Sequence, residues 1–257
     1  MKKFVAAFLC FFAFSAYAIT NIESQRLKPI PEGLSGQFEF AFDGKSGNTD
    51  EEDYGLAGRI NVKREQNLWF VIATKEYGEA NDVKDTDKSF LHGRWVHTLD
   101  NALAAEAFVQ YQENEFTRLL SRYLAGGGMR YTIKQDAKQQ LAAGAGAFYV
   151  NEREDLETYE AESDYLRLNS YISYKQELNS HVSLVSTAYY QPRASDFGDY
   201  NILWNTALSA KLSEQLALKL SFNATHDSEP PSNNEAEPPV DVDKTDLEYS
   251  LSVVYDF

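Results

Sequence analysis

The chain has 257 residues, 43% of them hydrophobic, and carries 39 aspartates and glutamates against 24 lysines and arginines, a formal net charge of −15. This acidity argues against a nucleic-acid-binding protein. A single cysteine excludes a disulfide framework, and neither a phosphate loop nor a zinc motif is present, so we expect no cofactor and no metal.

The first residues have the layout of a secretory signal peptide. Lys2 and Lys3 precede an apolar run over residues 4–14, which is too short for a permanent membrane anchor. Ala16 and Ala18 form a small-x-small cleavage site, so we expect the mature chain to begin at Ile19. We therefore predict a signal peptide over residues 1–18, a periplasmic segment over 19–32 and one domain over 33–257.

Beyond residue 33 the sequence alternates between apolar and polar side chains with the two-residue period of a β-strand. The first stripe is Leu34, Gly36, Phe38, Phe40 and Phe42. Further stripes take every second residue over 54–62, 103–111, 123–133, 141–149, 166–174, 182–190, 200–212, 216–224 and 247–257. Residues 68–77 and 90–97 are strand-like but have large apolar residues on both faces. This makes about 12 strands, each near the length of a tilted membrane strand.

The last strand distinguishes a membrane barrel from an ordinary all-β protein. A terminal Phe with Tyr two residues before it resembles the assembly signal of outer-membrane barrels. The whole stripe is Leu247, Tyr249, Leu251, Val253, Tyr255 and Phe257. With the signal peptide, this predicts a monomeric transmembrane antiparallel β-barrel in the outer membrane. Its expected partners are outer-membrane lipid and lipopolysaccharide, with the barrel-assembly machinery and periplasmic chaperones during biogenesis.

Connections between the stripes alternate in length. Short ones lie near residues 65–67, 99–101, 135–137, 178–180 and 213–215. Longer polar ones lie near 44–53, 78–88, 114–117, 151–164, 191–198 and 225–246. Short periplasmic turns and long outer loops are typical of such barrels, and an even strand number leaves both ends in the periplasm. We interpret the acidic outer loops as a solvated surface, with binding of divalent cations as the alternative.

If the apolar stripes face lipid, the residues that alternate with them face the lumen, and many of these residues are charged. They include Glu39, Arg59, Lys63, Arg94, Glu106, Arg122, Arg130, Arg167, Lys175, Lys211, Lys219 and Glu248. Such charges would be costly against lipid, which supports the assignment. The excess of basic residues predicts either a salt-bridge network that fills the barrel or a small anion-preferring channel. We favour the filled or narrowly conducting barrel, because about 12 strands enclose far less space than a porin of 16.

An enzymatic barrel is the competing class. His226 and Ser228 lie two residues apart and so share a strand face, which would suit a lipid A-modifying hydrolase at the outer rim. Asp227 and Glu229 are the nearest carboxylates, but they point to the opposite face. A two-residue match is a weak motif, so we expect no enzymatic activity and assign no catalytic residue.

Several segments together resemble a known family. They are Ser46-Gly47-Asn48-Thr49-Asp50, residues 216–221, Asp227-Ser228-Glu229-Pro230-Pro231, Lys244-Thr245-Asp246 and residues 251–257. They resemble the salt-induced outer-membrane proteins, catalogued as domain of unknown function 481, from about Gly33 to Phe257. The resemblance implies an outer-membrane barrel whose expression responds to salt or osmotic stress. It carries over no catalytic or binding residue.

Overall fold

The computed structural model describes residues 30–45, 51–233 and 240–257. The predicted signal peptide, with its cleavage site at Ala16, Ala18 and Ile19, lies outside the described residues, as does most of the predicted periplasmic segment. Within the described ranges, no helix is long and apolar enough to cross a membrane.

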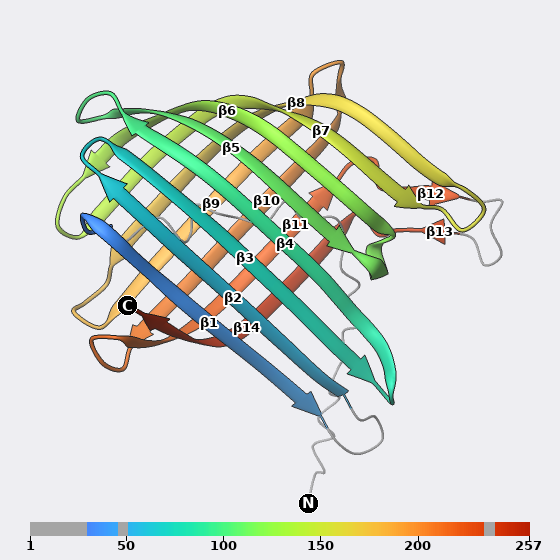
Figure 1. Ribbon diagram of the computed structural model, residues 1–257, viewed down its shortest axis with the longest axis horizontal. Coiled ribbons are helices and arrows are strands. Elements are labelled where there is room, and N and C mark those ends of the chain that lie inside the picture. The colour runs from blue at the N-terminus through green and yellow to red at the C-terminus, as the bar shows by residue number, and fades with distance from the viewer. Residues whose placement is uncertain (1–29, 46–50, 234–239) are drawn as a thin grey trace, which may run out of the picture.

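Twelve antiparallel strands close into one barrel, which confirms the predicted fold class (Figure 1). Around the barrel the order is β1 (Gly33–Lys45), β14 (Thr245–Asp256), β11 (Leu216–Asp227), β10 (Asp196–Lys211), β9 (Val182–Arg193), β8 (Glu160–Glu177), β7 (Gln139–Asp155), β6 (Leu119–Gln135), β5 (Leu103–Asn114), β4 (Val83–Thr98), β3 (Asn67–Ala80) and β2 (Glu51–Arg64), which pairs with β1. A short 3-10 turn, η2 (Glu115–Thr117), joins β5 to β6. A small two-stranded sheet, β12 (Ser232–Asn233) and β13 (Val240–Asp241), lies between β11 and β14 in the chain.

The alternation in the sequence becomes an exposed outer face and a buried inner face. On β14, Leu247, Tyr249 and Leu251 are exposed, whereas Ser252 and Val254 are buried. The strands that were ambiguous in the sequence, β3 and β4, carry apolar residues on both faces because the lumen holds a small apolar cluster at this point. The cluster consists of Phe70, Ile72, Phe90 and Val96, and the outward residues include Trp69, Val71, Leu91 and Trp95.

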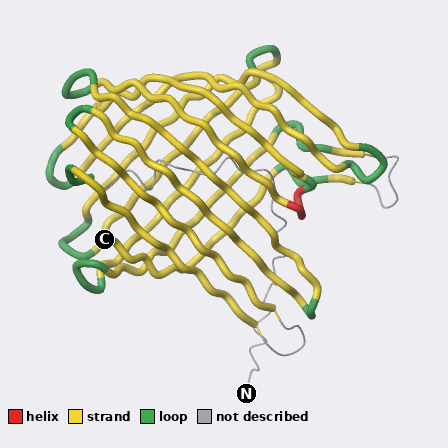
Figure 2. The backbone as a smooth tube through the Cα atoms, in the orientation of Figure 1, coloured by secondary structure: helices red, strands yellow, loops and turns green. Residues whose placement is uncertain are grey.

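One end of the barrel carries tight turns (Figure 2). Several of these turns are stabilised by a single side-chain oxygen. Asp100 Oδ1 accepts hydrogen bonds from the backbone N–H groups of Ala102 and Leu103. Asp136, Asn179 and Ser213 make the equivalent pair of contacts in their own turns. These side chains stabilise the turn because they satisfy backbone donors that have no strand partner. The two N–H groups lower the pKa of Asp100. We call this end the turn end.

At the opposite end, which we call the hairpin end, most of the segments predicted as long loops continue as strand. β3 and β4 are joined only by Asn81 and Asp82, which both have positive φ, as a tight hairpin requires. β9 and β10 are joined by residues 194–195 alone. Polar residues can extend a hairpin beyond the apolar stripes because they pair across it, as Arg153 does with Glu160. The long loops of the prediction are therefore shorter, apart from the segment between β11 and β14.

The barrel closes where the last strand meets the first. β1 and β14 pair from Gln37–Asp256 to Ala41–Ser252. Beyond this ladder, Gly36 N–H donates to the Phe257 carbonyl at 3.1 Å, and Phe257 N–H donates to the Gly36 carbonyl at 3.0 Å. The Phe257 ring stacks on Phe38 with centroids 5.4 Å apart. It occupies the space above Gly36, where a Cβ atom would overlap it.

Candidate functional site

The inner face of the barrel carries charged side chains in close pairs. Arg94 on β4 donates to Glu106 on β5 at 2.9 Å, and both side chains are at most 7% exposed. Arg94 Nε also contacts His92 Nε2 at 3.2 Å, and His92 Nδ1 lies 3.0 Å from Gln110 Oε1. The guanidinium stacks over the Phe108 ring at 5.0 Å. This pair is held by hydrogen bonds and by an aromatic face, which gives it a fixed geometry.

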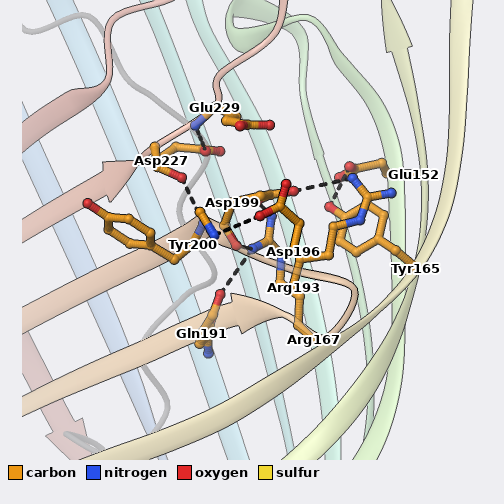
Figure 3. A network of polar contacts seen from close by, with 12 residues as sticks. Glu152, Tyr165, Arg167, Gln191, Arg193, Asp196, Asp199, Tyr200, Asp227 and Glu229 are labelled. Atoms are coloured by element: carbon orange, nitrogen blue, oxygen red, sulfur yellow. Dashed lines mark hydrogen bonds and ion pairs between the residues drawn. The ribbon is translucent and has the colours of Figure 1, made fainter.

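A larger network lies toward the hairpin end (Figure 3). Arg167 Nη2 contacts Asp199 Oδ1 at 2.6 Å, and Arg193 Nη1 contacts the other oxygen of the same carboxylate at 3.2 Å. Arg167 also donates to the Gln191 and Asp199 backbone carbonyls. The Tyr165 ring lies under both guanidinium groups, 5.0 Å from Arg167 and 4.4 Å from Arg193. The network therefore joins β8, β9 and β10.

Tyr165 links this network to a second ion pair. Its hydroxyl donates to Glu152 Oε1 at 2.5 Å, and Glu152 Oε2 accepts from Arg122 Nε at 2.5 Å. Arg122 lies on β6, Glu152 on β7 and Tyr165 on β8. Charged and phenolic groups are thus connected from β6 to β10, about half of the barrel circumference.

Two further contacts join strands that are not neighbours in the barrel. Lys88 Nζ on β4 contacts Glu248 Oε1 on β14 at 2.8 Å, and in the barrel order β3, β2 and β1 stand between these strands. Lys219 on β11 contacts Glu39 on β1 at 2.7 Å, and Ser252 on β14 donates to the same carboxylate at 2.5 Å. The Lys88–Glu248 contact therefore crosses the interior rather than following the wall.

The remaining predicted lumen residues make contacts of other kinds. Arg59 donates to Asn61 at 2.6 Å and stacks over Phe70 at 4.4 Å, and Arg130 donates to the Tyr171 hydroxyl at 3.2 Å. Lys63 donates to the Ile30 carbonyl, Lys175 contacts Glu177, and Lys211 is exposed near the turn end.

Sequence reasoning missed several residues of the networks, namely His92, Lys88, Glu152, Tyr165 and Asp199. Glu152 and Asp199 could have been predicted from the sequence. On β7, Phe148, Val150 and Glu152 are alternate residues that all face inward, and Glu152 lies beyond the end of the apolar stripe. Asp199 likewise continues the inward parity of Asn201 and Leu203 on β10. The choice of partner was out of reach, because Arg167 and Asp199 lie on strands separated by β9.

Two carboxyl groups at the hairpin end, those of Glu154 and Asp246, have a pKa raised to about 7. Glu154 lies beyond Tyr149, the last residue of its apolar stripe. Burial, followed by the nearby charge of Glu152, raises the pKa of Glu154 to about 7. This group therefore titrates near neutral pH.

The geometry of His226 and Ser228 does not form a catalytic pair. His226 Nδ1 lies 2.8 Å from the Thr245 hydroxyl, and its ring packs on Tyr200. The Ser228 hydroxyl oxygen accepts the backbone N–H of Tyr200 at 2.7 Å. A serine nucleophile needs a hydrogen bond to its base, and in the described residues these two side chains bond elsewhere. Nor do the described residues bring three or more His, Cys, Asp or Glu side chains together as metal ligands.

Solved structures with a similar fold are membrane barrels. An outer membrane channel from Pseudomonas putida F1 matches with a TM-score of 0.55 at 9% identity, covering 93% of this chain and 100% of that one. The NanC porin matches with a TM-score of 0.53 at 9% identity, covering 88% of this chain and 100% of that one. The translocator domain of autotransporter NalP from Neisseria meningitidis matches with a TM-score of 0.50 at 11% identity, covering 91% of this chain and 92% of that one.

At these identities the similarity establishes the fold and no more. No curated protein matches the chain. The family model described as protein of unknown function, DUF481, matches residues 38–257, which is most of the chain and nearly all of the barrel. The chain therefore belongs to the DUF481 family.

Proposed function

We propose that this chain is a non-enzymatic outer-membrane β-barrel protein whose lumen is narrowed by ion pairs, so that it conducts ions only weakly. The observation that carries the proposal is the Lys88–Glu248 contact, which joins β4 to β14 across the interior. Together with the network from Arg122 to Arg193, it places paired charges over both sides of the lumen near the hairpin end.

The outer face supports a place in a lipid bilayer. Large apolar side chains are exposed along the strands, including Phe38, Phe40, Leu56, Leu166 and Leu220. Paired strands in a closed barrel satisfy their backbone hydrogen bonds along each ladder, which is a condition for crossing a membrane with strands. An apolar outer face around a charged inner face is the arrangement of outer-membrane barrels.

The arginines favour the narrowed lumen over the anion-preferring channel. Arginine stays charged at working pH and must be paired or hydrated. Arg94, Arg122 and Arg167 each contact a carboxylate, so their charge is largely balanced within the protein. Induction by salt or osmotic stress remains a prediction from the sequence resemblance. The monomeric state and the partners in biogenesis remain predictions from the barrel pattern of the sequence.

Planar-bilayer recordings of the purified protein test the proposal. We expect little steady conductance from the native chain. The Glu39→Gln/Glu248→Gln double variant should conduct more, because Lys219 and Lys88 lose the contacts that hold them across the interior. The matched control is Glu65→Gln/Glu214→Gln, which neutralises two exposed carboxylates near the turn end. A large, stable conductance from the native protein would contradict the proposal.

The location is tested separately. The native chain should fractionate with outer membranes and migrate faster on a gel before heating than after, as folded barrels do. Recovery of the folded protein in a soluble fraction would refute the membrane assignment whatever the conductance.

A further inference from the structure

One side of the lumen carries buried oxygen atoms that have no hydrogen-bond partner among the described residues. They are Gln191 Oε1, Asn201 Oδ1, Asn205 Oδ1, Ser221 Oγ and Asp246 Oδ2. With Asp227 they lie on β9, β10, β11 and β14, which are consecutive in the barrel. We call these six residues the oxygen-lined wall.

The strand register makes this wall continuous. Asn201 is opposite both Gln191 on β9 and Asp227 on β11, and Thr225 is opposite Asp246 on β14. Residues directly opposite one another in an antiparallel pair have Cβ atoms about 5 Å apart. Successive inward residues along one strand are about 7 Å apart. The oxygens therefore form a series of closely spaced levels that leads from the hairpin end into the lumen.

The oxygen-lined wall carries two carboxyl groups, Asp227 and Asp246. Burial raises the pKa of both, that of Asp246 to about 7, so the wall becomes negatively charged as the pH rises above neutral. Arg94 and Arg122 are each balanced by the carboxylate that they contact, whereas Arg167 shares Asp199 with Arg193. Lys88 and Lys219 are balanced in the same way. By contrast, neither Asp227 nor Asp246 forms an ion pair with any of the described residues.

Buried acceptors of this kind need a donor or a cation from the lumen, because an unsatisfied buried oxygen is costly. We propose that the oxygen-lined wall is a binding track for small hydrated monovalent cations, which pass along β9, β10, β11 and β14. The inference rests on the proposed function, since it names the solute that a narrow lumen admits. This track would prefer cations, although the excess of basic lumen residues in the sequence predicts a preference for anions.

The spacing of the oxygens indicates transit rather than a held metal. A divalent calcium ion takes six to eight oxygen ligands at once. The wall offers two carboxylates, three amide oxygens and a hydroxyl spread over several levels. A cation that keeps part of its water shell can move from one level to the next, because no level offers enough oxygen ligands to hold it.

Crystals of the full-length protein soaked in rubidium bromide test the track without any need for conductance. We expect anomalous density for Rb⁺ along Asp227, Asn205 and Asp246, and no Br⁻ at these positions. In the Asp227→Asn/Asp246→Asn variant, the same density should fall to background. Native crystals that bind Br⁻ on this wall, or that hold no Rb⁺ there, would overturn the inference.

Reversal potentials in a potassium chloride gradient give a second measurement. A unit charge about 7 Å away in water changes the energy of a monovalent ion by roughly RT, with opposite sign for K⁺ and Cl⁻. At pH 8 each neutralised carboxylate should therefore lower the preference for K⁺ over Cl⁻ about sevenfold. The matched control, Asp82→Asn/Asp85→Asn, removes the same charges from the exposed tip of the β3–β4 hairpin and should leave the preference unchanged. If both double variants lower the K⁺ preference equally, the track is refuted, and the selectivity comes from the surface charge of the barrel. A wide native conductance would instead contradict the narrowed lumen and leave the rubidium result to decide the track.

Discussion

The carboxylate of Asp199 forms ion pairs with two arginines. Its two oxygens contact Arg167 and Arg193 separately, and its side chain is only 8% exposed. Removal of one partner from a buried ion pair leaves an uncompensated charge, which typically costs about 3–5 kcal/mol. Replacement of the pair by apolar residues of similar volume is often close to neutral, since both desolvation costs disappear together.

We therefore predict that Asp199→Ala lowers the free energy of unfolding by about 3 kcal/mol. Arg167→Met/Asp199→Leu should recover most of the loss. Urea unfolding in detergent micelles, followed by tryptophan fluorescence, measures both variants. Asp196→Ala, on the same hairpin but exposed, is the control. A native-like unfolding midpoint for Asp199→Ala would show that water in the lumen already screens these charges.

Glu154 gives the protein a stability that depends on pH. Its pKa is raised to about 7 in the folded protein, above the ordinary value of a glutamate in the unfolded chain. Between these two values the folded state binds the extra proton, so its free energy of unfolding falls as the pH rises from about 4.5 to 7. Below this window the group makes no difference, and above it the penalty is complete.

Glu154→Gln should therefore match the native protein at pH 4 and be more stable at pH 8. The expected gain is about 1–3 kcal/mol, since the full shift is discounted for partial exposure. Unfolding midpoints measured across this range test the prediction, with Glu157→Gln at the exposed hairpin tip as control. A gain that is equal at both pH values would indicate better packing of the amide instead of relief from ionisation.

At the scale of the strands, Phe257 joins the last element to the first. Its backbone exchanges two hydrogen bonds with Gly36, and its ring covers the same glycine while stacking on Phe38. Gly36 can accept the ring because it has no Cβ. The contact thus depends on a large aromatic residue directly after β14 and the smallest residue on β1.

Deletion of Phe257 should leave the barrel unclosed, and the protein should be found unfolded or degraded in the periplasm. Phe257→Tyr preserves the ring and should assemble at the native level. Gly36→Val keeps the terminal residue but removes its space, so it should reproduce the defect. Outer-membrane yield and gel mobility before and after heating provide the measurement. Native yield from the truncated chain would refute a role for Phe257 in closure.

The sequence predicted individual strands better than it predicted their ends. A period of two identifies β1 and β14 because one face of each is apolar and the other polar. It could not orient β3 and β4, where Phe70 and Ile72 are apolar residues that face inward. Nor could it show that Glu160 continues β8, because polar residues that pair only with each other resemble a loop in the sequence.

At the scale of the whole molecule, closure brings together residues that no local pattern relates. The sequence analysis placed the charges of Arg94 and Glu106 inside the barrel, and their strands are neighbours in the chain, so this pair could have been predicted. Lys88 and Glu248 are far apart in the chain, and their contact depends on the curvature of the closed sheet. The side chains of the candidate site were therefore largely identifiable, but the connections among them were not.

The seam between β1 and β14 affects how firmly the barrel is closed. Its ladder ends at Ala41–Ser252, although β1 continues to Lys45 and β14 begins at Thr245. Over residues 42–45 and 245–251, each strand is therefore held on one side only, by β2 and by β11. Backbone groups without a ladder partner have the lowest free energy of local opening, and in hydrocarbon each would cost several kcal/mol. Transient unzipping should begin there, and the adjacent lipid leaflet should thin to let water reach the free edges.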